Sequence, residues 1–273
     1  MTNIRCIIIS LRNESSSPKT LYQDGLAIKC ENISPYLKSS NNIIVYKRNK
    51  PLSTLPPIGY GSSALDGGNL ILSTEEKNDL LLGYPEAERY IRKIIGSQEL
   101  LKNLERWCLW IEPKDLNEAK RIGPIAERIE KVRLFRQKSK RQSTIKAADT
   151  PYRFGEARLT DGSIIVIPKV SSERREYLPL GYLGTGAVIM DKAFPVYNAD
   201  LYIFAVLASR MHMAWINAVS GRLKTDISYS SSICYNTFPL RALNEFEKSE
   251  LSHKAKNVLF VRENHSEKTL AEM

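Results

Sequence analysis

Apolar residues recur with two different periods along this chain of 273 residues, so the pattern predicts strands as well as helices. Short runs rich in β-branched residues predict strands over 5–11, 42–47, 70–72, 107–111 and 163–170, with a return strand over 177–183. Helical spacing predicts helices over 75–82, 86–95, 125–135 and 201–219, and in the last thirty residues. The fold class expected from this order is α+β, a mixed sheet with packed helices, followed by a C-terminal helical segment.

The segment 201–219 is the most apolar of the predicted helices. Asn198 or Asp200 can cap its start, and Gly221 can end it. Its apolar run is interrupted, before it could cross about 30 Å of hydrocarbon, by three polar residues: Arg210, His212 and Asn217. We therefore expect one buried core helix here and no contact with a membrane.

Positive charge is concentrated in one stretch of the chain. Residues 120–146 hold ten Lys or Arg and two Glu, a net charge of +8 against +10 for the whole chain. The helix predicted here has an apolar stripe at Ile125, Ile129, Val132 and Phe135, and its basic residues lie off that stripe or follow it. The alternative is an ordinary solvated helix face.

Double-stranded DNA is the partner that this charge predicts, because a dense basic stripe binds a duplex by displacing counterions from its phosphates. Contacts with the DNA backbone are predicted for Arg133, Arg136, Lys138, Lys140, Arg141, Lys146, Lys169, Arg222 and Lys224.

Sequence motifs for catalysis are absent. The glycine-containing segments lack the spacing of phosphate and dinucleotide loops, and no GxSxG nucleophile elbow occurs. DNA adenine methyltransferases need an Asn/Asp-Pro-Pro-aromatic loop that holds the flipped base, and the nearest segments, 34–36 and 55–58, each lack part of it. We therefore expect no catalytic residue and no cofactor in this chain.

Cysteine usage gives no metal site. Cys6, Cys30, Cys108 and Cys234 are far apart, and they fit buried apolar positions better than a ligand cluster. No signal peptide is evident, so we expect a reduced, cytoplasmic protein.

Six segments, in order along the chain, resemble a known family. They are NLILSTEEK at 69–77, RWCLW at 106–110, IPKVSSERR at 167–175, MHMAW at 211–215, SGRLK at 220–224 and YNTFP at 235–239. Together they resemble the target recognition domain of the MmeI-type (type IIL) restriction–modification enzymes. Members of that family are single chains with a nuclease, an adenine methyltransferase and one recognition domain that serves both.

The resemblance implies a sequence-specific DNA recognition module without its own catalytic site. It divides the chain into 1–30, a remnant of the last methyltransferase strand with a linker, then 31–240, the recognition domain, and 241–273, a truncated helical segment. S-adenosylmethionine and Mg²⁺ are expected only in full-length members. The alternative is the specificity part of a split DNA adenine methyltransferase whose catalytic subunit is a separate methyltransferase or nuclease chain. A third reading is a basic RNA-binding or scaffold protein.

The resemblance also directs attention to the turn Ser171, Ser172, Glu173, Arg174 and Arg175, which is predicted to read bases. Glu173 and Arg175 are two residues apart, so in an extended chain they face the same way. A Glu accepts from cytosine N4 and an Arg donates to guanine O6 and N7, so the pair could read one C·G pair. The alternative is a solvated charged turn.

Overall fold

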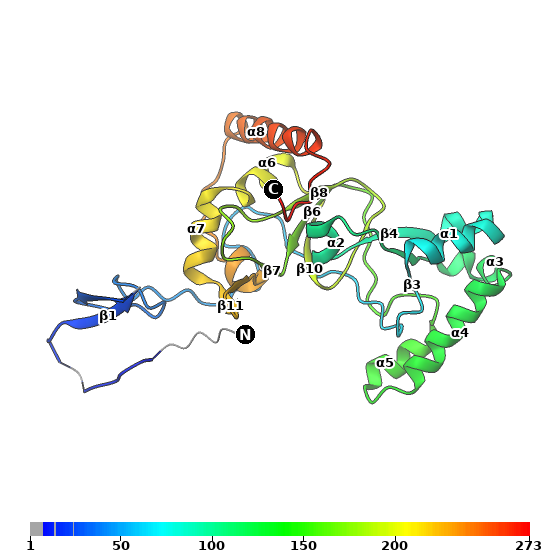
Figure 1. Cartoon of the computed structure of the whole chain (residues 1–273), viewed down its shortest axis with the longest axis horizontal. Helices are drawn as coiled ribbons and strands as arrows, with labels where there is room; N and C mark the ends of the chain where they lie inside the picture. The colour runs from blue at the N-terminus through cyan, green and yellow to red at the C-terminus, as the bar shows by residue number, and fades with distance from the viewer. Residues whose placement is uncertain (1–7, 14, 24) are drawn as a thin grey trace. The chain divides into compact units, whose positions relative to one another are not determined.

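The computed structural model describes residues 8–13, 15–23 and 25–273, which form two compact units (Figure 1). Unit 1 consists of Met1–Leu55, Val170–Tyr177 and Ser209–Ala242, and unit 2 of Pro56–Lys169, Leu178–Ala208 and Leu243–Met273. Both contain strands and helices, which confirms the predicted α+β class. The units interleave along the sequence, and the predicted boundaries at residues 30 and 240 stay a prediction.

Unit 2 contains two small sheets. The four-stranded sheet has the order β3 (Ile71–Leu72), β5 (Trp107–Leu109), β4 (Ile91–Ile95) and β9 (Val188–Ile189), and its β4–β9 pair is parallel. The three-stranded antiparallel sheet has the order β10 (Ala193–Tyr197), β6 (Ile164–Pro168) and β8 (Gly181–Leu183). Every residue of β6 is buried, which explains why its sequence is continuously apolar rather than alternating.

Unit 2 also contains α-helices and 3₁₀ turns. They are α1 (Thr74–Gly83), α2 (Ser97–Lys102), α3 (Leu116–Ala119), α4 (Gly123–Gln137), α5 (Gln142–Lys146), α6 (Leu201–Leu207) and α8 (Glu245–Glu263), with 3₁₀ turns at Pro85–Tyr90, Pro113–Asp115 and Ala147–Asp149. A capping box starts α1, because Ser73 Oγ accepts from the Glu76 amide and the Glu76 carboxylate accepts from the Ser73 amide. That bond from the Ser73 amide lowers the pKa of Glu76. Helix α8 packs along α6 (Figure 1).

Unit 1 is built from shorter elements. They are the hairpin β1 (Lys19–Gln23) and β2 (Leu26–Cys30), the sheet β11 (Gly221–Leu223), β12 (Asp226–Ser228) and β7 (Val170–Ser171), helix α7 (Arg210–Val219) and a π-helix at Ser231–Tyr235. The N-terminal segment is fastened to the π-helix region, since the Asn236 side chain donates to the Arg48 carbonyl and the Leu52 amide donates to the Asn236 carbonyl.

The structure corrects two predicted helices. Residues 86–95 form a 3₁₀ turn and then strand β4, because Ile91–Ile95 is held between β5 and β9 in the sheet core. Residues 201–219 form two helices, α6 and α7, because Ser209 stops the first and caps the second by accepting from the His212 amide.

Two predicted strands are also wrong or untested. Residues 42–47 have no regular structure. For the predicted strand 5–11, residues 1–7 lie outside the described residues, and residues 8–11 are not in a strand. Helix α1 and strands β3, β5, β6 and β8 occur where the pattern predicts them, with β8 returning beside β6.

Arg136 is the most unusual residue of the core. Its side chain is completely buried, in the stripe position where the sequence predicts Phe135, and Phe135 is instead 47% exposed. All five of its N–H donors bond to carbonyls: Nε to Leu65, Nη1 to Ala147 and Thr150, and Nη2 to Ala64 and Arg153, at 2.6–3.0 Å. Burial lowers the pKa of Arg136, and the nearby Asp66 carboxylate partly offsets this effect.

His212 has a comparable position in unit 1. It is fully buried, its ring packs edge-on against Phe238 at 4.6 Å, and its Nε2 lies 3.1 Å from the Tyr229 hydroxyl. Burial lowers the pKa of His212 to about 3, so the folded protein holds a neutral imidazole at all ordinary pH values.

We predict that Arg136→Met lowers the free energy of unfolding of unit 2 by about 3–5 kcal/mol, because five carbonyls lose their donor. Urea unfolding followed by circular dichroism measures this change. Arg133→Met is the matched control on the same helix, and it should cost no more than about 0.5 kcal/mol. Equal urea midpoints for the two variants would contradict the structural role of Arg136.

We predict a second, pH-dependent effect at His212. Its unfolded pKa of about 6.5 exceeds its folded pKa of about 3, so the unfolded state binds the proton first. Stability is therefore complete above about pH 6.5 and decreases as the pH falls toward 3, by about 2 kcal/mol between pH 7 and pH 5. Urea unfolding followed by NMR signals of unit 1 should show this slope shrinking in His212→Phe and persisting in His253→Asn, where the histidine is exposed.

Candidate nucleic-acid interface

The predicted recognition residues form a turn that leaves a short strand. Ser171 is the last residue of β7, and it pairs with Ile227 of β12. The turn that follows is closed by a bond from the Arg175 amide to the Ser172 carbonyl, and the Arg174 amide also donates to Ser172 Oγ, both at 3.3 Å. The turn is therefore fixed at its base by both the sheet and its own serine.

Sheet register brings this turn beside a second basic segment. Because β7 and β12 run antiparallel with Ser171 opposite Ile227, the chain beyond Ser171 lies at the same end of the sheet as the β11–β12 turn. That turn contains Lys224, which has the left-handed φ of 58°. Arg222 on β11 is at the level of Ser171, across β12. One sheet end thus combines residues that are about fifty positions apart in sequence.

Two details of the predicted reading geometry are corrected. The chain at Glu173 and Arg175 is turned and not extended, so alternation along a strand does not align the two side chains. Ser171 is only 3% exposed, because its place in β7 directs its side chain to the interior, so it has no surface to offer a base. Arg174 is exposed, while Ser172, Glu173 and Arg175 are half-buried.

One residue that holds the segment directly after this turn was not predicted from the sequence. Arg210, the first residue of α7, forms an ion pair with Glu176, and its guanidinium carbon lies 5.7 Å from the centre of the Tyr177 ring. A cation at the N-terminus of a helix opposes the helix dipole, so Arg210 is better explained by these contacts than by helix stability. Its position directly after a Ser cap was the available signal. Arg222 is similarly held, by bonds to Ser220 Oγ and Asn217 Oδ1 at 3.3 and 3.2 Å.

The basic helix of unit 2 is less free than its sequence suggests. Arg128 binds Glu76 at 2.5 Å, Lys131 binds Glu127 at 2.6 Å, and Arg133 lies 3.4 Å from Glu130. Arg136 is buried, with every donor used inside the protein, so its predicted phosphate contact is wrong for this fold. Exposed basic residues that have no ion pair within the described part of the chain follow α4: Lys138, Lys140, Arg141 and Lys146. Lys120 and Arg121, before α4, are also exposed and in no ion pair of the described residues, so the positive surface lies before α4 as well as at its end and along α5.

Lys169, the remaining predicted backbone contact, belongs to unit 2 and is half-buried. Its ammonium lies 4.6 Å from the centre of the Phe194 ring and 6.0 Å from that of Tyr60. Burial lowers the pKa of Lys169. The ammonium is already in a cation–π contact, so a phosphate would have to share it with the two rings.

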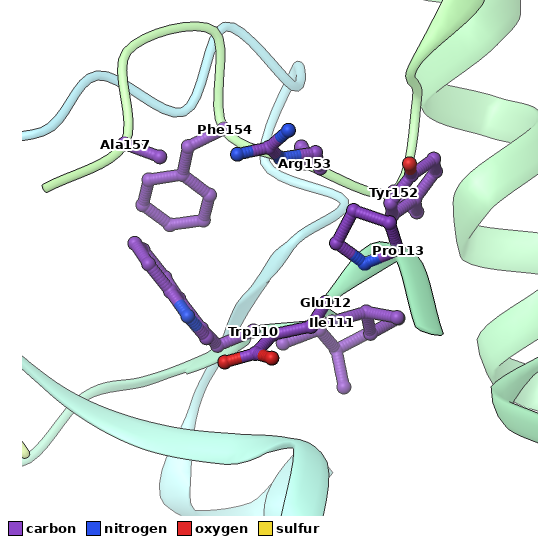
Figure 2. A pocket seen from close by; sticks show the side chains of 9 residues that line it. Trp110, Ile111, Glu112, Pro113, Tyr152, Arg153, Phe154 and Ala157 are labelled. Carbon is purple, nitrogen blue, oxygen red and sulfur yellow. The ribbon is translucent and has the colours of Figure 1, made fainter. Parts of the chain in front are cut away.

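One small cavity of unit 2 is lined by aromatic side chains (Figure 2). Trp110 and Phe154 meet edge to face at 5.6 Å on one side, and Pro113 and Tyr152 lie across the gap. Its volume of about 40 Å³ holds a few water molecules and is too small for a nucleobase. None of the predicted DNA-binding residues lines it. The pocket is therefore a packing gap and not part of the candidate interface.

Three further findings concern metal ligands, cysteine thiols and membrane-spanning helices. In the part of the chain that the structure describes, no group of three or more His, Cys, Asp or Glu side chains could hold a metal ion. Cys30, Cys108 and Cys234 are buried free thiols, as expected, whereas Cys6 lies outside the described residues. Among the same described residues, no helix has the length and apolarity that a membrane span requires.

Comparison with known proteins gives one family and two informative relatives. The profile of the family described as "MmeI, target recognition domain" matches residues 39–242. The protein named DNA methyltransferase A of Bacillus subtilis (strain 168) is 40% identical over 255 residues, which is 93% of this chain and 29% of that protein. The structure of the type IIL restriction-modification enzyme MmeI in complex with DNA matches with a TM-score of 0.88 and 35% identity, over 94% of this chain and 35% of that one. The chain thus spans about a third of the length of these relatives.

Proposed function

The chain belongs to the MmeI target recognition domain family, and on that premise we propose that it recognises a specific sequence in double-stranded DNA for a restriction–modification system. The observation that carries the proposal is the sheet end at which the turn 172–175 lies beside Lys224 and Arg222. In this proposal the turn supplies groups for base edges, and its neighbours supply positive charge for phosphates.

Within this proposal, base edges are read by the turn side chains: Ser172, Glu173, Arg174 and Arg175. Phosphates are bound by the exposed cations of both units: Arg222, Lys224, Lys138, Lys140, Arg141 and Lys146, with Lys169 in a supporting contact. Phosphate contacts set position and affinity, and base contacts set sequence preference. A binding experiment can therefore distinguish the two groups of residues, because changes in one group alter affinity for all sequences and changes in the other alter sequence preference.

Methyl transfer and cleavage are assigned to the parts of the longer relatives that this chain does not match, together with S-adenosylmethionine and Mg²⁺. The chain then acts in the cytoplasm, on DNA, without turnover of its own. The 40% identity to a protein named DNA methyltransferase A favours one alternative, the specificity part of a split adenine methyltransferase with a separate catalytic chain. Labelled S-adenosylmethionine and DNA of mixed sequence distinguish the two. Transfer only on addition of a catalytic chain supports the alternative, and transfer by the pure chain contradicts both.

We predict that replacing Lys138, Lys140, Arg141 and Lys146 by Ala weakens binding to all DNA sequences alike. Each lost phosphate contact should also reduce the slope of log K against log salt by about 1. Titration at several salt concentrations measures both effects. A variant of Lys131, Arg133 and Arg128 is the matched control, because their charges are already paired within the protein. If the two sets change the slope equally, the cations after α4 have no special role.

We also predict an exchange of base preference at the turn. With Glu173→Lys and Arg175→Asp together, the new Lys can donate to guanine O6 and N7, and the new Asp can accept from cytosine N4. The prediction takes the turn, and not strand alternation, to bring both side chains to one base pair. The preferred pair at that position should then change from C·G to G·C, with a discrimination of roughly 1–3 kcal/mol. Selection of bound sequences from a random DNA pool, with the parent and the variant in parallel, gives both consensus sequences.

Each single change supplies the control for this exchange. Glu173→Lys or Arg175→Asp alone should lower affinity without a clean switch, because one charge then faces the wrong base edge. Identical consensus sequences from the parent and the double variant would mean that the turn does not read bases. The same selection tests the proposed function itself, since a parent chain that enriches no sequence is not a specific reader.

A further inference from the structure

Tyr60 of unit 2 stands on a backbone that is held on both sides of it. The Gly59 amide donates to the Pro195 carbonyl at 2.7 Å, and the Ser62 amide donates to the Ile189 carbonyl at 2.6 Å. Pro195 belongs to β10 and Ile189 to β9, so the segment is tied to two strands. The Tyr60 side chain therefore projects from backbone that has little freedom to move.

Gly61 makes this close attachment possible. A Cβ atom at Gly61 would overlap the Met190 carbonyl, so the position accepts only glycine. Ser62 continues the approach and forms a parallel bridge with Met190. The Tyr60 side chain is nevertheless 54% exposed. A closely packed backbone thus presents a large aromatic ring to the solvent.

A second ring and a cation lie beside Tyr60. Phe194 meets it edge to face, with 5.8 Å between the ring centres. The Lys169 ammonium lies 6.0 Å from the centre of the Tyr60 ring and 4.6 Å from that of Phe194. The pairing of β6 with β10 brings Lys169 there, because Lys169 follows Pro168, which is opposite Ala193. Within the described part of the chain the Tyr60 hydroxyl makes no hydrogen bond, so its donor is available.

We infer that Tyr60 and Lys169 together hold one phosphate of the DNA backbone. The Tyr60 hydroxyl donates to a phosphate oxygen, the Lys169 ammonium supplies positive charge, and the exposed part of the ring packs on the adjoining deoxyribose. This inference rests on the proposed function, and it adds to it a contact that sets position without reading sequence. It also explains how Lys169 can serve a phosphate while it stays beside two rings.

The charges around the cluster favour a phosphate. Two charged neighbours act on the Lys169 ammonium, the Asp191 carboxylate and the Lys192 ammonium, so the two cations outnumber the one anion. Burial lowers the pKa of Lys169, and an added anion would counter this effect by stabilising the charged form. A base is a less suitable occupant, because stacking on Tyr60 would need an unpaired base or an opened base step.

The alternative is a tyrosine that only covers Phe194, which is 6% exposed. The two roles differ at the hydroxyl, because covering Phe194 needs only the ring of Tyr60, whereas a phosphate contact needs the hydroxyl as well. The fixed backbone favours binding, since a group that is already ordered loses little entropy when its partner arrives. Tyr60→Phe therefore separates the two roles without removing the ring.

The first test measures the affinity of the full chain for the duplex that it selects most strongly from the random pool. In Tyr60→Phe we expect a loss of about tenfold, because one hydrogen bond to a charged group disappears, and an unchanged consensus sequence. Tyr22→Phe is the matched control at a tyrosine that is 76% exposed, and its affinity should stay within about twofold of the parent. Equal affinities of Tyr60→Phe and the parent would overturn the inference.

The second test locates the phosphate with neutral methylphosphonates, placed one at a time in the same duplex. The position held by Tyr60 and Lys169 should be costly to neutralise in the parent and much less costly in both Tyr60→Phe and Lys169→Met. Lys169→Met should also reduce the slope of log K against log salt by about 1, and Tyr60→Phe should not, because a hydroxyl is uncharged. If no position responds to both substitutions, the two residues do not share a phosphate and the inference is wrong.

A fluorescent adenine analogue in the duplex tests for base stacking. Emission that rises on binding of the parent but not of Tyr60→Leu would show that the ring opens a base step, which overturns the phosphate contact. The outcomes also separate this inference from the proposed function. A parent chain that binds duplexes without enriching any sequence defeats specific recognition, while the methylphosphonate result still decides the role of Tyr60. A parent chain that binds no duplex defeats both.

Discussion

The charge of Arg136 is the constraint on which unit 2 depends. An ionised guanidinium can be buried only if its donors are satisfied, and here five carbonyls from 64–65 and 147–153 surround it. The carbonyls of Ala147 and Thr150 belong to the 3₁₀ turn Ala147–Asp149 and its C-terminal cap, whereas those of Ala64 and Leu65 belong to the loop before β3. The guanidinium therefore joins two segments of different local structure. It ties the loop before β3 to the turns after α5, through a side chain that helix α4 holds in place. Neighbouring Gly67 shows how close the packing is. Its φ is +62°, and a Cβ there would lie 2.7 Å from the Phe135 ring.

This use of an arginine changes what the basic segment can do. Three of its other cations are paired with Glu76, Glu127 and Glu130, so much of the charge on α4 is already neutralised. Positive charge that can act over a distance remains before the helix, at Lys120 and Arg121, and after it, where α5 and its flanking residues carry it on short, exposed elements. Charge counted along a sequence therefore overestimates charge offered to DNA, because it cannot distinguish a guanidinium that binds carbonyls from one that faces solvent.

Local patterns explain which elements could be predicted. Helix α1 has a complete capping box in its sequence, and β6 is a buried run of β-branched residues, so both were predictable from a few neighbouring residues. The strand at Ile91–Ile95 was not, because the sequence before it also fits a helix and only pairing with β5 and β9 decides the outcome. Arg136 was missed for the same reason, since its partners are distant carbonyls that have no sequence signature. The break at Ser209 was readable in principle, as a serine followed three residues later by the amide that it caps.

The candidate site also depends on contacts that are distant in sequence, and its turn is presented by a small sheet. The turn 171–175 and the basic residues Arg222 and Lys224 were predicted separately, and only the register of β7, β12 and β11 brings them to one sheet end. The turn side chains stand on a strand of two residues, so the sheet fixes the base of the turn and leaves its tip to the contacts around it. Arg210 supplies such a contact through Glu176 and Tyr177, outside the turn itself. Under the proposed function, the side chains at the tip can be exchanged without disturbing the sheet that presents them. The proposed sequence preference would then change while the fold and the proposed phosphate contacts stay the same.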